Sequence, residues 1–226
     1  MSEAKGRFFL NLDSDDEATP DALAHFALWC ADLPDDFAAV AALCCDEQGA
    51  TLGDEFPVSP LDSCRPELRY RYKVTGDKWL CHRTEVLRRF PFPAPAGVKF
   101  VQERAILAQI SAQYRARYVN AKLKIVHQGP ARLSDNLRQH PLGVALGQRS
   151  VLNHEIAWFR HAPLHFLRTA ANYTRLSLQA GESLQLQWSG LNSAGARVLW
   201  LLTLPLGVFL QKRDKAQSAQ KPSDKP

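Results

Sequence analysis

The sequence lacks several features that would assign it directly to a class of protein. None of its five cysteines forms a CxxC pair, and most of them lie in apolar runs. We therefore expect reduced, buried thiols in a cytosolic protein, without a zinc site. The N-terminus, MSEAKGRFF, has neither the basic region nor the apolar stretch of a signal peptide. A composition of 46% hydrophobic and 23% charged residues excludes a wholly disordered or collagen-like chain.

No apolar run reaches the roughly 20 residues that a membrane-spanning helix needs. The most apolar stretch, Val198–Leu210, has 13 residues and contains Pro205 and Gly207. A basic cluster at 212–215 follows it directly. Such a segment can lie in a membrane interface and bind anionic lipid, or it can pack as a helix against the protein's own core. The sequence leaves both interpretations open.

Charge is unevenly distributed along the chain. Residues 1–66 carry 14 acidic and 3 basic side chains, whereas residues 67–226 carry 9 acidic and 25 basic ones. The first part could hold cations, and the second would favour phosphates or anionic lipid. No recognition motif accompanies the basic residues, so we expect no nucleic-acid partner.

The pattern of apolar residues predicts an α/β part at 1–133, a basic helical extension at 134–215 and a disordered tail at 216–226. We expect strands at 7–12, 37–45, 70–74, 79–82, 117–120 and 123–127. We expect helices at 84–90, 102–114, 135–140, 144–159, 164–178, 183–191 and 196–211, and a proline-rich loop at 91–97. A further helix begins at Thr19 as N-cap and buries Leu23, Phe26, Ala27 and Cys30.

Three aspartates follow the first predicted strand, which we expect to be buried. Asp13, Asp15 and Asp16 stand at its carboxyl end, where ligands bind in open α/β sheets. Three neighbouring carboxylates repel one another unless a cation lies among them, and hard oxygen ligands suit Mg²⁺ or Mn²⁺. A solvated helix start would also explain them, since aspartates favour helix N-termini. Both possibilities stay open on spacing alone.

The string EAKGRFFLNLDSDDEATPDAL resembles the central segment of glycosyltransferase family 2. The similarity continues through GDKWLCHRTEVLRRFPFP, KFVQERAILAQIS and RYVNAKLKIVHQGPARLSDN, and it reaches AANYTRLSL and LPLGVFLQKRD. This order is similar to that of a bacterial subgroup associated with capsular and other surface polysaccharides. The resemblance implies an incomplete GT-A-type, Rossmann-like mixed sheet with a C-terminal helical extension.

The resemblance also implies an activity. It implies transfer of a sugar from a nucleotide-sugar donor to a hydroxyl of a glycan or lipid-linked acceptor, with inversion, at the cytoplasmic membrane surface. Asp13 and Asp15 would form the DxD pair that contacts the donor and its metal, and Asp16 would be an auxiliary acid. Mg²⁺ or Mn²⁺ would neutralise the leaving nucleoside diphosphate.

Four further residues receive roles from the same resemblance. Glu103 would be the base that takes the acceptor proton, although the aspartate usual beside it is absent. Asp77 and Trp79 would shape the acceptor pocket, and His127 would be a third metal ligand. Each also has a plain structural interpretation: a first-turn carboxylate for Glu103, a strand edge for Asp77 and Trp79, and a hydrogen-bonded strand end for His127.

Family 2 enzymes have a βαβ region before the DxD strand that binds the nucleotide base and ribose. Only a dozen residues precede Asp13, fewer than the roughly 30 that a βαβ unit needs. We therefore expect this chain to lack half of its donor site and to expose strand edges. The alternative to an active enzyme is an inactive fragment whose basic helices bind a membrane or a partner.

Overall fold

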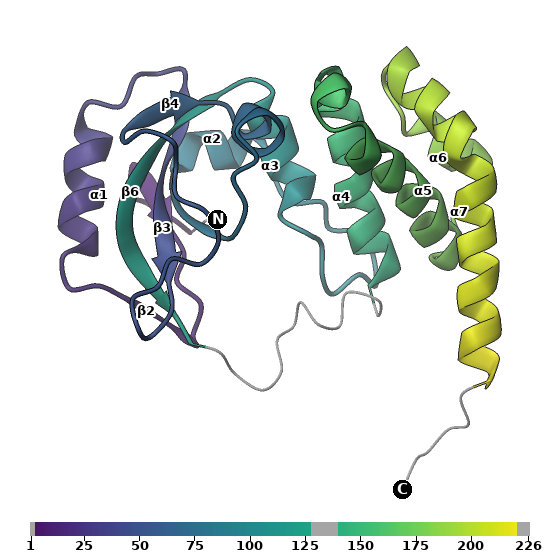
Figure 1. The fold of residues 1–226 in the computed structure, drawn as a ribbon, viewed down its shortest axis with the longest axis horizontal. Coiled ribbons are helices and arrows are strands. Elements are labelled where there is room, and N and C mark those ends of the chain that lie inside the picture. Colours follow the sequence, from purple (N-terminus) through teal and green to yellow (C-terminus); the bar gives the residue numbers. More distant parts are fainter. Residues whose placement is uncertain (1–2, 128–139, 221–226) are drawn as a thin grey trace, which may run out of the picture. The chain divides into compact units, whose positions relative to one another are not determined.

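The fold is described from a computed structural model, for residues 3–127 and 140–220 (Figure 1). The described residues form two compact units. The first contains the residues up to Pro91 and those from Leu107 to 127, and the second contains Phe92–Ile106 and the residues from 140 onward. The boundary expected at residue 133 lies outside the described residues, and Phe92–Ile106 belongs to the second unit.

The first unit is built on a curled mixed sheet (Figure 1). Its strand order is β1-β5-β3-β6-β2, with β4 also paired to β6. The central strands β3 and β6 are parallel, and all other pairs are antiparallel. The strands are β1 (Phe8–Leu10), β2 (Asp16–Ala18), β3 (Phe37–Cys45), β4 (Leu61–Ser63), β5 (Lys78–Arg83) and β6 (Arg115–Val126). The mixed α/β class with C-terminal helices is thus confirmed.

Strand β3 is the centre of this unit, and every one of its residues is buried. Its sequence, FAAVAALCC, consists of small and apolar residues, so both faces of the pleat can be covered closely. Val40, Ala42 and Cys44 pack on one face in a cluster with Phe26 of α1 (Ala22–Ala31). Ala39, Ala41 and Leu43 pack on the other face with Phe56, Leu68 and Tyr118.

The strand before the aspartates lies at the edge of the sheet, not in its buried interior. Phe8, Phe9 and Leu10 are half-buried and pair only with β5, in antiparallel orientation. The expectation of a buried strand was therefore wrong. An apolar run of three residues also occurs where a short edge strand is covered on one face only.

Helix α1 begins later than expected, and of the four residues expected to be buried only Phe26 and Cys30 are. Its N-cap is Asp21, and the Thr19 hydroxyl donates a hydrogen bond to the Asp21 carboxylate at 2.8 Å. Ala22, Phe26 and Cys30 are buried, whereas Leu23 is 71% exposed. The buried residues of α1 are thus four positions apart, so only a narrow face of the helix is covered.

Three other local predictions also need correction. The segment at 70–74 is no strand: Glu67–Arg71 forms the π-helical turn η1, closed by a hydrogen bond from the Tyr72 N–H to the Glu67 carbonyl at 3.1 Å. The two short strands expected at 117–127 are one strand, β6. Helix α3 (Arg104–Ser111) is shorter than expected. Strand β5, helix α2 (Thr84–Arg89) and the loop after it agree with the sequence.

The second unit is helical beyond residue 140. Its helices are α4 (Pro141–His154), the 3-10 helix η3 (Ile156–His161), α5 (Pro163–Gln179), α6 (Leu184–Ser189) and α7 (Ala194–Gln220). Helix α5 packs against both α4 and α7. Helix α7 continues through Pro205 to Gln220, so the tail predicted from 216 is helical as far as 220. The helix predicted at 135–140 and the end of the tail lie outside the described residues, apart from His140.

Candidate functional site

Several loops and strand ends of the first unit meet at one edge of the sheet. The parallel strands β3 and β6 both end there, and the antiparallel strands β2 and β5 both begin there, as the pairs Leu43–Lys78 and Asp16–Val126 show. Six acidic residues stand in these loops and strand ends, and we call them together the acidic edge: Asp13, Asp15, Asp16, Glu17, Glu47 and Asp77. His127, which follows β6, lies at the same edge.

Lys124 of β6 pairs with two carboxylates of the acidic edge, and the sequence analysis missed it. Its ammonium contacts the Asp13 carboxylate at 3.2 Å and also pairs with Asp16. The Lys124 and Asp16 side chains are only 12% and 7% exposed. Burial by itself would lower the pKa of Lys124, but the hydrogen bonds with Asp16 and Asp13 outweigh it and raise that pKa. The protein's own lysine therefore compensates the clustered carboxylates.

This arrangement does not fit a bound divalent metal as it stands. Carboxylate oxygens are suitable ligands for Mg²⁺ or Mn²⁺. However, Asp13 and Asp16 share the Lys124 ammonium, and Asp15 is exposed and takes no part in that contact. Among residues 3–127 and 140–220, no group of three or more His, Cys, Asp or Glu side chains could hold a metal ion. We therefore derive no chemical step through a metal.

His127 contacts carboxylates on both sides of its ring. Its Nδ1 atom lies 2.6 Å from the Glu47 carboxylate, and its Nε2 atom lies 3.6 Å from that of Glu17. The hydrogen bond with Glu47 and the charges of both glutamates raise the pKa of His127. Both ring nitrogens therefore already lie beside carboxylates of the protein itself. The contacts of His127 match the hydrogen-bonded strand end that the sequence also allowed.

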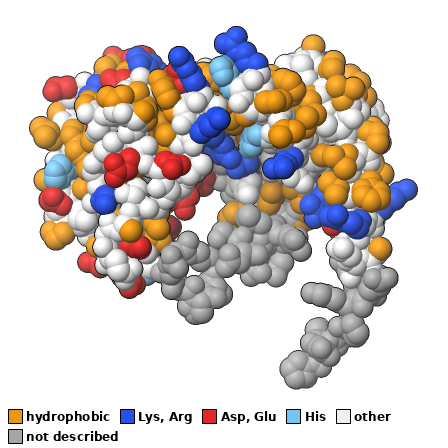
Figure 2. Space-filling view, viewed as in Figure 1, with side chains coloured by type: hydrophobic (Ala, Val, Ile, Leu, Met, Phe, Trp, Pro, Cys, Tyr) orange, Lys and Arg blue, Asp and Glu red, His pale blue; other side chains and the backbone are white. Residues whose placement is uncertain are grey.

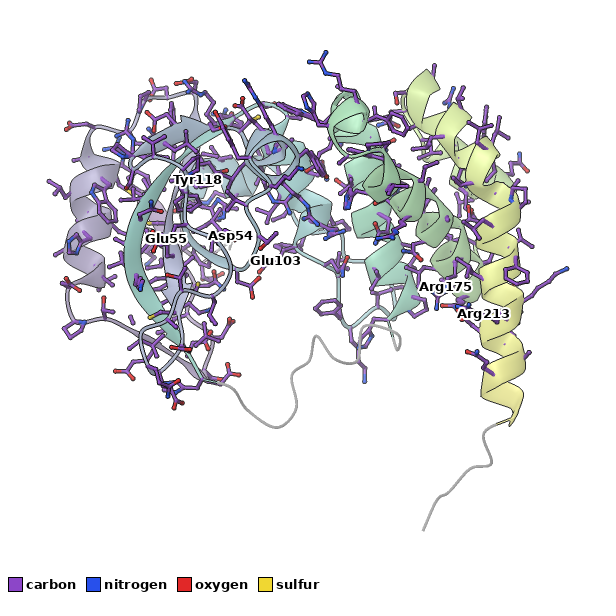
Figure 3. All side chains as sticks on the ribbon, in the orientation of Figure 1. Asp54, Glu55, Glu103, Tyr118, Arg175 and Arg213 are labelled. Carbon is purple, nitrogen blue, oxygen red and sulfur yellow. The ribbon has the colours of Figure 1, made fainter. Side chains whose placement is uncertain are left out.

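Two facing loops hold Asp77 at the acidic edge (Figure 3 labels Asp54). The Asp54 carboxylate accepts hydrogen bonds from the Thr75 N–H at 2.9 Å and from the Thr75 hydroxyl at 2.6 Å. These bonds lower the pKa of Asp54. Gly53 and Gly76 have positive φ angles, and a Cβ on Gly76 would lie 2.3 Å from the Leu52 carbonyl oxygen. Each of these loops contains a Gly-Asp pair, Gly53-Asp54 and Gly76-Asp77. These pairs were the sequence signal that could have revealed the close contact between the two loops.

Trp79 supports the acidic edge from inside the core. Its ring is 4% exposed and contacts Phe26 edge to face, with the ring centroids 5.3 Å apart. Its indole N–H donates to the Asn11 carbonyl at 2.6 Å. This bond fixes the backbone two residues before Asp13. The buried indole thus positions the turn that carries the aspartates.

Cys44 lies beneath the same edge. Burial raises the pKa of its thiol to about 11, with Lys124 acting in the opposite direction and Asp77 and Asp16 adding to the rise. Cys44 is therefore close to charged residues of the turn, of β6 and of the loop before β5.

Five of the seven residues proposed from the sequence lie at the acidic edge around the end of β3, namely Asp13, Asp15, Asp16, Asp77 and His127.

Glu103 belongs to the second unit, directly before α3 (Figure 3). Its side chain is exposed, and its carbonyl accepts a hydrogen bond from the Ile106 N–H at 3.0 Å. It therefore stands at a helix N-terminus, where the helix dipole favours a carboxylate.

Known families and proteins do not identify the site. No family model matches the chain, and no curated protein matches it. The candidate site therefore rests on its own geometry and on the motifs quoted above.

Proposed function

We propose that the protein is a GT-A-type glycosyltransferase, or the C-terminal part of one. It transfers a sugar from a nucleotide-sugar donor to a hydroxyl of a glycan or lipid-linked acceptor in surface-polysaccharide synthesis. The acidic edge is the observation that supports this proposal, because it gathers Asp13, Asp15, Asp16 and Asp77 beyond the carboxyl ends of β3 and β6. Ligands of open α/β sheets bind in this position.

The carboxylates of the acidic edge are suited to hydroxyl-rich ligands. An ionised carboxylate only accepts hydrogen bonds, and ribose and hexose hydroxyls are donors that it can bind. Asp15 and Asp77 are exposed, so we assign donor contacts to them first. Lys124 supplies a positive charge beside Asp13 and Asp16. We assign to Glu103 the removal of the acceptor proton, which an inverting displacement requires.

Mg²⁺ or Mn²⁺ can be the cofactor of this enzyme only if Lys124 moves away from Asp13 and Asp16. The ion would bind to Asp13 and Asp16 if Lys124 left them, since the ammonium now occupies that position. Metal dependence is therefore one of the quantities that the test measures.

The test is donor binding by the full chain. Isothermal titration calorimetry measures it with UDP-, GDP-, dTDP- and CMP-linked sugars, with and without Mn²⁺. We expect one class of donor to bind. Asp15→Ala should weaken binding about 10- to 100-fold, the loss of one charge-assisted hydrogen bond. Asp36→Ala is the matched control, because this exposed aspartate precedes β3 at the opposite edge of the sheet. Equal binding by Asp15→Ala and wild type would refute the site assignment.

Absence of binding to every donor, in both metal conditions, would refute an active enzyme in this chain. The inactive fragment that binds a membrane or a partner would then be the better proposal.

A further inference from the structure

Helix α7 has two apolar faces, and only one of them is covered. The covered face has the spacing of a packed helix and consists of Ala196, Leu199, Trp200, Thr203, Gly207 and Gln211. The opposite face carries five large apolar side chains that are 50–72% exposed, namely Val198, Leu201, Leu202, Leu206 and Phe209. A helix on the surface of a water-soluble unit normally has polar residues on its outer face. The outer face of α7 therefore needs an apolar surrounding.

The inner face of α7 is firmly held by α5. At Gly207 the two helices are so close that a Cβ would lie 2.7 Å from the Ala171 carbonyl oxygen. Near the end of the helix, Asp214 accepts hydrogen bonds from Arg175 and Gln179 of α5 (Figure 3 labels Arg175). Because these half-buried groups join α7 to its neighbour, leaving α5 would cost both hydrogen bonds.

By length and composition alone, Ala194–Gln217 could cross a membrane. A crossing helix, however, would either separate Asp214 from its partner Arg175 or draw Arg175 and the rest of α5 toward the hydrocarbon, and both are costly. Helix α7 keeps its hydrogen bonds with α5 on one side and has an apolar face on the other. A helix of this kind can lie in the plane of the membrane interface.

The C-terminal end of the outer face is positively charged. Lys212, Arg213 and Lys215 follow Phe209 and are exposed. At the other end, Arg197 lies over the Trp188 ring of α6 at 5.2 Å. Figure 2 shows hydrophobic side chains over this helix and Lys and Arg side chains near its C-terminal end. The exposed positive charge next to this face disfavours a second copy of the chain there and favours anionic phosphates.

We propose that the outer face of α7 docks lengthwise on the interface of an anionic phospholipid membrane. The five apolar side chains enter the boundary of the acyl chains, and the basic cluster at 212–215 contacts the lipid phosphates. Trp188, which is 38% exposed and contacts Trp200 at 5.9 Å, adds an aromatic anchor at the first end. This surface is independent of the acidic edge, so the proposal holds whether or not the chain transfers sugars.

The experiment is cosedimentation of the full chain with vesicles of phosphatidylcholine alone and with vesicles that also contain phosphatidylglycerol. We expect binding to the anionic vesicles that weakens as salt is added. The double substitution Leu202→Glu and Phe209→Glu should weaken it at least about tenfold. Substituting Lys212, Arg213 and Lys215 by Gln should weaken it on the order of 100-fold, at roughly fivefold per charge.

The matched control is Leu23→Glu with Leu28→Glu, two α1 side chains that are 71% and 69% exposed. This pair should leave vesicle binding unchanged, and circular dichroism should show that both double variants are folded. Three results would overturn the proposal: no binding to anionic vesicles, equal loss in the control pair, or a dimer that only Leu202→Glu with Phe209→Glu dissociates and that binds no vesicles.

Discussion

Replacing Lys124 by methionine tests the charge balance of the acidic edge most directly. Methionine keeps most of the apolar stem of lysine, so the substitution removes mainly the ammonium. Breaking a fully buried pair costs about 3–5 kcal/mol, and an exposed pair contributes about 0–1 kcal/mol. The Lys124–Asp16 contact is mostly buried, whereas the Asp13 side chain is 60% exposed. We therefore expect a loss of about 2 kcal/mol in the free energy of unfolding.

Urea unfolding at neutral pH, followed by tryptophan fluorescence, measures this loss. A loss of 2 kcal/mol corresponds to a melting temperature lower by about 4–8 °C for a chain of this size. Lys5→Met, at an exposed lysine, is the control. In a double-mutant cycle, Asp16→Asn should cost less in the Lys124→Met background than in the wild type. Additive costs, or a loss below about 0.5 kcal/mol for Lys124→Met, would refute the reasoning.

The pH dependence of the same variant has a definite sign. Because the folded protein raises the pKa of Lys124 above its ordinary value of 10.5, its contribution to stability is fully present below that value and is lost as the pH rises. The difference between wild type and Lys124→Met should therefore shrink in strong alkali. A difference that grows with pH would contradict the pairing.

Three further predictions concern the metal, the core and the loops. Lys124→Met should bind Mn²⁺ about tenfold more tightly than the wild type, as measured by paramagnetic relaxation, because one competing cation is gone; unchanged affinity would separate Lys124 from the metal question. Burial lowers the pKa of His82 to about 4, and its Nδ1 atom is buried without a partner in the described structure. NMR should find that pKa, and stability should fall as the pH drops from about 6.5 to about 4, since only the unfolded state gains the proton there. Gly76→Ala should lower the melting temperature more than Gly49→Ala, because both φ angles are positive but only Gly76 lacks room for a Cβ; equal losses would mean that the loops do not clamp each other.

The elements that could be predicted from the sequence are those whose local residue pattern is compatible with only one kind of secondary structure. The run Phe37–Cys45 is apolar throughout and of strand length, and it forms the buried strand β3. The prolines at 91–97 can only form a loop, and they do. A helix was expected near Thr84, and α2 begins at that residue, although its N-cap is Arg83 and not Thr84 as expected.

Other patterns were ambiguous without the tertiary structure. Tyr70 and Tyr72 alternate with basic residues, as on the buried face of a half-exposed strand, but Tyr70 lies in a π-helical turn and is buried, whereas Tyr72 directly follows the turn and is 41% exposed. Leu23 has the spacing of a buried residue, but the sheet covers the neighbouring face of α1. The end of α7 is polar, and a helix already stabilised on α5 continues through it.

The candidate site was predictable as a group of carboxylates but not as a network. Lys124 stands 111 positions from Asp13 along the chain, and only the pairing of β2 with β6 brings them together. The same holds for Glu47 and His127, which meet because β3 and β6 end at one edge. Such partners follow from strand register, which the sequence alone does not reveal.

The charge asymmetry of the chain acquires a different meaning in the fold. From the sequence the acidic first part could hold cations, and in the fold basic residues from beyond position 66 supply several of them. These pairs are Arg83–Asp35, Arg117–Asp62, Lys124–Asp13, Lys124–Asp16 and His127–Glu47. Asp15 and Asp77 are exposed and take no part in these pairs, so they are the carboxylates best placed to meet a ligand. A ligand that binds through them need not displace any internal ion pair, whereas a metal on Asp13 and Asp16 must first displace Lys124.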